Sequence, residues 1–114
     1  MSVVEQYARA HIVSDVDIAE DEAIPVVLRY DPEDPRSVRI RLPGTPEWTF
    51  SRALLEQGLR APVGSGEVRV WPCGRVQAVV EFHSPHGVSV VQFEQKALLR
   101  FLRRTYTATA PVRG

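Results

Sequence analysis

Short runs of strictly alternating apolar and charged residues limit the fold of this chain more than any other feature. The run Val38–Leu42 reads VRIRL, and the run Val68–Trp71 reads VRVW. Successive side chains of a β-strand point to opposite faces, so such runs predict strands with one face on a core and the other in water. Clusters of proline, glycine and aspartate separate the runs and mark turns.

The whole pattern predicts an α+β fold of mainly antiparallel sheets in one domain over residues 1–114. Its order is four strands, a helix, three strands and a second helix. The predicted strands are Val3–Val13, Ile24–Tyr30, Val38–Leu42, Glu47–Phe50, Glu67–Trp71, Arg75–His83 and Val88–Phe93; the predicted helices are Arg52–Gln57 and Glu94–Thr105.

Both predicted helices have local signals. Ser51 is suited to cap the first helix through its hydroxyl, and Gly58 is suited to end it in a left-handed conformation. The second helix places its apolar residues on one face and arginines on another, so we expect its apolar stripe to lie on a sheet. The first face carries Leu98, Phe101, Leu102 and Thr105, and the arginines are Arg100, Arg103 and Arg104.

Two loop-like stretches have no chemical signature. Ser14–Glu22 is acidic but lacks the glycine and closing glutamate of a calcium loop, so it predicts a solvated loop. Pro62–Gly66 is glycine-rich, but it precedes a strand, whereas a phosphate-binding loop opens a helix. We expect a flexible connection there.

Composition restricts the class of function. Fourteen basic residues balance fourteen acidic ones, so no net field draws the chain to nucleic acid or anionic lipid, and any charge effect must be local. The single cysteine forms no internal disulfide, and neither a signal peptide nor a membrane-spanning apolar run is present. We therefore expect a cytoplasmic protein without direct membrane insertion.

The residues that could carry catalysis or bind a metal are isolated. His83 and His86 have a spacing seen in metal sites but lack further ligands, and Cys73 has no histidine beside it in sequence. A metal enzyme or an esterase-like enzyme would depend on these three residues alone. We expect no catalytic residue, no metal and no cofactor.

Arginines alternate with apolar residues on predicted strands that also carry aromatic neighbours such as Trp48 and Trp71, and this pattern suggests a binding surface. Arg39, Arg41 and Arg69 share outward faces with aromatic neighbours, and interleaved cations and rings suit single-stranded nucleic acid. Alternating arginine is also ordinary solvated surface, and tryptophan gains most from burial in a core or an interface. With zero net charge, nucleic-acid binding is the weaker interpretation.

Four segments in this order resemble the SsgA-like family of actinobacterial sporulation and cell-division proteins. The similarity extends over nearly the whole chain, and the combined order is more specific than any single segment. The segments are Leu28–Pro35 (LRYDPEDP), Glu47–Leu55 (EWTFSRALL), Gly66–Pro72 (GEVRVWP) and Phe101–Thr105 (FLRRT).

The resemblance implies a whirly-like fold of two sheet-plus-helix halves in a bell-shaped homotrimer. It also implies a non-enzymatic regulator of septation in spore-forming actinobacteria, located in the cytoplasm at the division septum. Members of the family help position the tubulin-like division protein FtsZ, control septal wall synthesis or act in spore maturation. The expected partners are therefore the chain itself, FtsZ, other SsgA-like proteins or septal wall-synthesis proteins.

Within this interpretation the expected partner-binding residues are Trp48, Trp71, Arg41 and Arg69, because tryptophan and arginine contribute much of the binding energy of interfaces. The alternative function is a single-stranded nucleic-acid-binding module with the same whirly-like fold.

Overall fold

The computed structural model describes residues 3–13, 23–85 and 87–109. Eight strands and two helices follow one another in it. The strands are β1 (Val4–Val13), β2 (Ala23–Tyr30), β3 (Ser37–Arg41), β4 (Trp48–Ser51), β5 (Val63–Ser65), β6 (Val68–Cys73), β7 (Gln77–Ser84) and β8 (Gly87–Glu94); the helices are α1 (Arg52–Gly58) and α2 (Gln95–Thr109).

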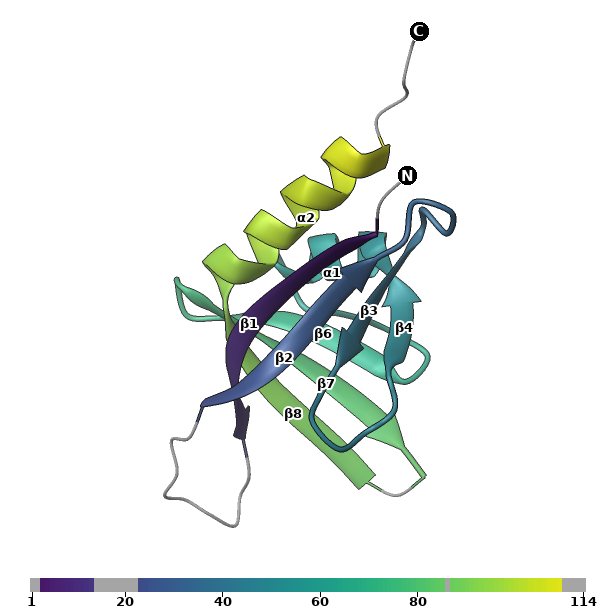
Figure 1. The fold of residues 1–114 in the computed structure, drawn as a ribbon. Helices are drawn as coiled ribbons and strands as arrows, with labels where there is room; N and C mark the ends of the chain where they lie inside the picture. Colours follow the sequence, from purple (N-terminus) through teal and green to yellow (C-terminus); the bar gives the residue numbers. More distant parts are fainter. Residues whose placement is uncertain (1–2, 14–22, 86, 110–114) are drawn as a thin grey trace, which may run out of the picture.

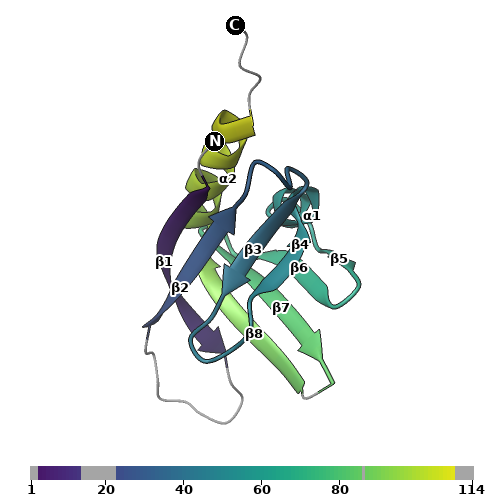
Figure 2. The same ribbon diagram turned by 45° about the vertical axis from the view of Figure 1, so that its right-hand side comes forward.

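All eight strands form one antiparallel sheet in the order β4-β3-β2-β1-β8-β7-β6-β5. The long strand β1 joins the two halves, because Val4–His11 pair with β2 while Ala10–Val13 pair with β8. The sheet curls strongly, so that its first four and last four strands face each other across a shared interior (Figures 1 and 2). The predicted antiparallel α+β fold is thus confirmed, as one continuous sheet with two helices.

The inner face of the curled sheet carries the core, as the alternation predicted. Val26, Leu28 and Tyr30 of β2 are fully buried, and the apolar residues of β3 and β6 are buried in the same way. The strand predicted at Arg75–His83 begins later, at Gln77, and Val76, which precedes it, is 68% exposed. Burial of these apolar side chains is the main source of the stability of the fold.

Helix α2 lies against the inner side of the junction between β1 and β8 (Figure 1). Leu98, Phe101 and Leu102 are buried on this side, which confirms the predicted stripe. Gln6 of β1 is also buried, and its side-chain amide donates to the Ala97 carbonyl oxygen at 2.9 Å. This hydrogen bond fixes the first turns of α2 on β1.

Arg52 connects helix α1 to helix α2 and to β2. Its guanidinium lies 4.0 Å from the ring centre of Tyr106 and 5.4 Å from that of Tyr30, and it donates to the Thr105 hydroxyl. The Tyr106 hydroxyl donates to the Glu56 carboxylate, and this hydrogen bond, with burial, raises the pKa of Tyr106 above its ordinary value. The two contacts between the guanidinium and the tyrosine rings are of the cation–π type. Together with the hydrogen bonds, they hold the two helices together.

The structure corrects the predicted flexible connection at Pro62–Gly66 and the predicted end of the next strand at Trp71. Val63–Ser65 form a strand, β5, in addition to the seven that were predicted. Gly66 takes a positive φ of 63° in the tight turn to β6. Strand β6 continues through Pro72 to Cys73. Proline is tolerated there because β5 pairs only as far as Val70, so the Pro72 nitrogen needs no partner on that edge.

Gly58 does not end α1 in a left-handed conformation, contrary to the sequence prediction. It is helical, and the cap residue Leu59 has φ −77°. A Cβ atom at Gly58 would lie 2.3 Å from Val70 Cβ, so glycine is required for the close approach of α1 to β6. Ser51 does cap the helix, accepting from the Leu54 amide at 3.1 Å. The acidic stretch Ser14–Glu22 lies outside the described residues.

Replacing Gly58 with alanine tests this close approach. Helix propensity alone would stabilise the protein by about 1 kcal/mol, but the clash with Val70 predicts a loss of about 1–3 kcal/mol in the free energy of unfolding. Urea denaturation measures the difference. Gln57→Ala, at an exposed neighbouring position, should change stability by no more than about 0.5 kcal/mol. A gain of stability in Gly58→Ala would contradict the packing argument.

Candidate partner-binding surface

The four residues expected to bind a partner lie on three separate surfaces. Trp48 faces the interior of the curled sheet from β4, because it pairs with the buried Ile40. Arg69 and Trp71 lie on the outer face of β6, since they alternate with buried valines. Arg41 is exposed on the outer face of β3, in the other half of the sheet. The structure therefore brings Arg69 and Trp71 together but separates them from Trp48 and Arg41.

Trp48 closes the seam at which the two halves of the curled sheet meet. Its ring stacks on Phe82 of β7 at 4.8 Å between centres, and Phe50 approaches the Phe82 ring edge-on at 6.2 Å. These contacts bring β4, in one half of the sheet, against β7, in the other, without a backbone hydrogen bond between them. Aromatic stacking and apolar burial hold the seam.

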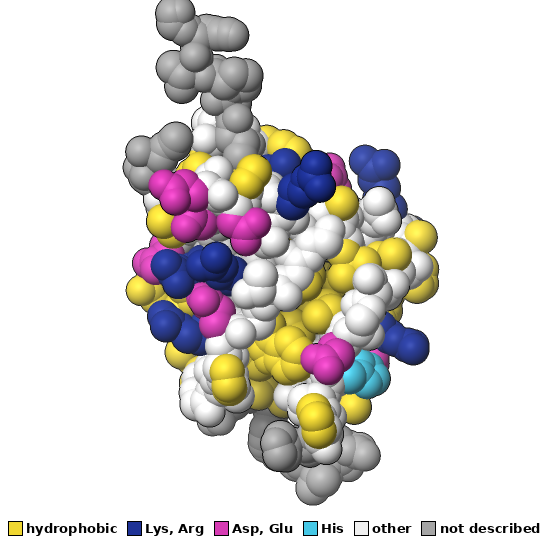
Figure 3. Space-filling view, turned by 90° about the vertical axis from the view of Figure 1, so that its right-hand side faces the viewer, with side chains coloured by type: hydrophobic (Ala, Val, Ile, Leu, Met, Phe, Trp, Pro, Cys, Tyr) yellow, Lys and Arg dark blue, Asp and Glu magenta, His cyan; other side chains and the backbone are white. Residues whose placement is uncertain are grey.

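A groove runs along each side of Trp48 at this seam. The larger groove has a volume of about 540 Å³, lies between the β3–β4 loop and the β7–β8 hairpin, and is lined mainly by apolar atoms. The smaller groove, about 280 Å³, lies between β4 and the β5–β6 hairpin. Figure 3 shows apolar side chains filling a furrow across this face of the molecule. An apolar furrow beside a half-buried tryptophan can accept an apolar side chain of a partner.

Arg69 and Trp71 line a separate hollow on the outer face of the second half of the sheet. It has a volume of about 570 Å³, and its walls are the β5 strand with its turn and Glu81 of β7. A Cβ atom at Gly64 would lie 2.9 Å from Arg69 Cγ, so glycine leaves room for the Arg69 side chain. A cation, a carboxylate and an indole ring in one hollow suit a polar partner surface.

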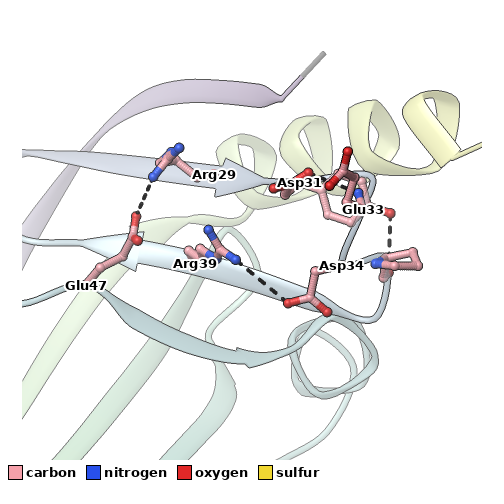
Figure 4. Close-up of polar contacts among 8 residues, drawn as sticks. Arg29, Asp31, Glu33, Asp34, Arg39 and Glu47 are labelled. Atoms are coloured by element: carbon pink, nitrogen blue, oxygen red, sulfur yellow. Dashed lines mark hydrogen bonds and ion pairs between the residues drawn. The ribbon is translucent and has the colours of Figure 1, made fainter. Parts of the chain in front are cut away.

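Ion pairs cover the outer face of the first half of the sheet and were missed by the sequence prediction. Arg29 lies 3.2 Å from the carboxylates of both Glu5 and Glu47, and Arg39 lies 3.8 Å from Asp34. Figure 4 shows the pairs with Glu47 and Asp34. The sequence did contain a signal for these ion pairs, because most of the residues lie in the segments that resemble the SsgA-like family. The residues come together only once the strands are paired in register. Arg39 is thereby partly neutralised, whereas the exposed Arg41 has no ion-pair partner among the described residues.

The β2–β3 turn beside these ion pairs is ordered by Asp31. Its carboxylate accepts from the Glu33 amide at 3.0 Å, and its carbonyl oxygen accepts from the Asp34 amide at 2.8 Å. An aspartate that caps its own turn is typical of this loop chemistry. The turn therefore presents three carboxylates at one end of the sheet, which Figure 4 shows together.

Of the three residues considered for catalysis or metal binding, the structure describes His83 and Cys73. His83 Nε2 lies 2.8 Å from the Glu81 carboxylate, and Cys73 is exposed. Over the described ranges, no group of three His, Cys, Asp or Glu side chains could hold a metal ion; His86 lies outside them. None of the helices that the structure describes is both long and apolar enough to cross a membrane.

The curled sheet with its two helices, its apolar furrow and its polar hollow can be compared with known proteins. Residues 24–113 match the family described as Streptomyces sporulation and cell division protein, SsgA. Sporulation-specific cell division protein SsgB of Streptomyces coelicolor is 39% identical over 95 residues, 77% of this chain and 69% of that protein. SsgB of Frankia casuarinae is 38% identical over 93 residues, 75% of this chain and 64% of that protein.

Solved structures show the same fold. A structure from work on SsgB mutations that correlate to longitudinal cell division during sporulation of Streptomyces coelicolor has a TM-score of 0.82 and 32% identity, and the match covers 96% of this chain and 91% of that one. An SsgA-like sporulation-specific cell division protein from Thermobifida fusca has a TM-score of 0.74 and 26% identity, with 96% and 84% covered.

The chain belongs to the SsgA family of sporulation and cell division proteins, as the resemblance of its segments indicated. This family has no known catalytic activity. The segments that carried the resemblance now have places in the structure: the ion-paired face, the Trp48 seam, the Trp71 hollow and helix α2.

Replacing Trp48 tests whether it closes the seam. Trp48→Ala should lower the free energy of unfolding by about 2–4 kcal/mol, because the stack on Phe82 and its apolar burial are lost. Trp48→Phe should lose less than half of that amount. Trp71→Ala is the matched control, since Trp71 faces the outer hollow. Equal losses for Trp48→Ala and Trp71→Ala in urea denaturation would show that Trp48 has no special role at the seam.

Proposed function

We propose that this protein is a non-enzymatic regulator of cell division during sporulation that helps position or recruit the division machinery at the septum. The observation that carries the proposal is the match of residues 24–113 to the SsgA family, together with 39% identity to SsgB of Streptomyces coelicolor. The partner would be FtsZ, another SsgA-like protein or a septal wall-synthesis protein. The similarity to a structure from work on SsgB division mutants supports the role in septation.

The surfaces described above support a binding role. The furrow at the Trp48 seam offers apolar contact, and the hollow at Arg69 and Trp71 offers charge and aromatic area. Trp and Arg contribute disproportionately to interfaces, so both surfaces are suited to a protein partner. Because the two surfaces lie on different faces, two partners can bind at the same time, as an adaptor requires.

The proposal includes a whirly-like homotrimer. Strands β4 and β5 are the two edges of the sheet, and in a single chain their outer backbone groups lack a paired strand. The outer face of β1 also exposes Tyr7 to 71% and Val13 to 49%. Self-association into a closed ring would cover such edges and apolar side chains and would protect them from aggregation.

The nucleic-acid alternative has less support from the charge distribution. Arg39 is paired with Asp34, and Arg41 and Arg69 lie on opposite halves of the sheet. Single-stranded nucleic acid needs a continuous basic groove with stacking rings. The arginines on the outer sheet faces do not line up into such a track, so the adaptor function is favoured.

Analytical ultracentrifugation with purified FtsZ tests this proposal. The molecular mass measured for the protein alone should be three times the chain mass of 12.8 kDa. In a mixture, the protein should co-sediment with FtsZ polymers. Arg69→Ala/Trp71→Ala should weaken co-sedimentation at least tenfold if the hollow contacts FtsZ, because two interface residues of this kind contribute more than 1.4 kcal/mol. A monomer that binds neither FtsZ nor another division protein would contradict the proposal.

A further inference from the structure

Helix α2 carries a line of cations on its outer side. Lys96, Arg100 and Arg103 are four and three residues apart, so they lie on one side of the helix, opposite the buried Leu98 and Leu102. All three are exposed. The helix Gln95–Thr109 contains no aspartate or glutamate. In a chain with no net charge, this is a local concentration of one sign.

This arrangement is unfavourable for the helix itself. Like charges at positions i and i+4, such as Lys96 and Arg100, destabilise a helix by a few tenths of a kcal/mol. Lys96 also lies in the first turn, which contains no acidic residue, and the helix dipole disfavours a cation there. Stability alone does not explain the line of cations, which points to an anionic partner.

No carboxylate of the described residues pairs with these three cations. Among the neighbouring acidic groups, Glu56 accepts from the Tyr106 hydroxyl and Glu5 pairs with Arg29. Glu94 is exposed just before the helix and contacts neither Lys96 nor Arg100 in an ion pair. The cations therefore remain available to an outside partner.

Exposed apolar side chains lie beside the cations. Leu99 is 44% exposed and lies between Lys96 and Arg103 on the helix. Val76, in the β6–β7 turn, is 68% exposed, and its carbonyl oxygen accepts from the Gln95 amide at 2.8 Å, which places the turn at the start of α2 (Figure 1). The exposed Arg75 precedes Val76 and adds another cation near this end of the helix.

We propose that the outer face of α2, formed by Lys96, Leu99, Arg100 and Arg103 with Val76 beside it, binds the surface of a bilayer that contains anionic phospholipids. Basic residues near an anionic bilayer are attracted to it, and apolar side chains gain by entering the boundary between headgroups and acyl chains. A nucleic acid would satisfy the cations but would leave Leu99 and Val76 without benefit. The contact is peripheral, because the described helices include none that could span a membrane.

Membrane contact through α2 would leave the other surfaces free, and its consequence for cell division rests on the proposed function. The furrow at Trp48 and the hollow at Trp71 lie on different elements from α2. The protein would then hold a division partner against the inner surface of the membrane. Each basic residue contributes about 1 kcal/mol of attraction, which corresponds to about a fivefold change in binding.

Vesicle co-sedimentation at low salt tests the proposal with the full chain. Vesicles of phosphatidylcholine with one third phosphatidylglycerol should bind the protein, and pure phosphatidylcholine should not. Lys96→Gln/Arg100→Gln/Arg103→Gln should weaken binding on the order of a hundredfold, because three cations act together. Leu99→Gln should weaken it several-fold.

The matched control removes three cations elsewhere. Arg9→Gln/Arg36→Gln/Arg60→Gln changes the net charge equally at exposed positions and should leave vesicle binding within about twofold. Circular dichroism verifies that each variant folds. Equal losses in both triple variants, or no binding to anionic vesicles, would overturn the proposal. Binding of a single-stranded oligonucleotide through the same cations, without dependence on Leu99 and in preference to vesicles, would also overturn it.

Discussion

The pairing of β1 with β8 is the constraint on which the rest of the structure depends. Four residue pairs, from Ala10 with Phe93 to Val13 with Val90, join the first and last strands of the chain in the middle of the sheet. Through them the two halves of the chain share one interior, which α1 and α2 cover. The same closure brings β4 against β7, so that Trp48 stacks on Phe82, and turns the outer faces of the two halves away from each other.

The arrangement of the candidate binding surfaces follows from this closure. Because the halves face each other, two tryptophans that were predicted to serve the same partner-binding role lie on different faces. Trp48 closes the inner seam, while Trp71 lines an outer hollow. The ion pairs around Arg29 cover a third surface, and α2 presents a fourth. A small domain can in this way offer several independent contact surfaces, and this property suits a protein that brings components of a division site together.

Local sequence patterns predicted most of the fold. Most of the wrong predictions concern places where elements distant in the sequence pack closely against each other. The alternation in Val38–Leu42 and the hydroxyl of Ser51 act over a few residues, so the sequence identified the strand and the helix cap. Strand β5 exists because β6 lies beside it, and Gly58 is required by Val70, which is distant in sequence. Such requirements arise from tertiary packing and leave no local signature. The binding residues proposed from the preference of interfaces for tryptophan and arginine remain predictions, because the structure separates them without showing which of them touch a partner.

The central claim is that this protein acts at the division septum during sporulation, and the position of a fluorescent fusion in sporulating hyphae of Streptomyces coelicolor tests it most directly. The account predicts regular ladders that coincide with FtsZ rings, adjacent to the membrane. Signal spread evenly through the cytoplasm, or concentrated over the nucleoids, would contradict it. In the second case the arginines of the chain would have to be reconsidered as a nucleic-acid-binding surface.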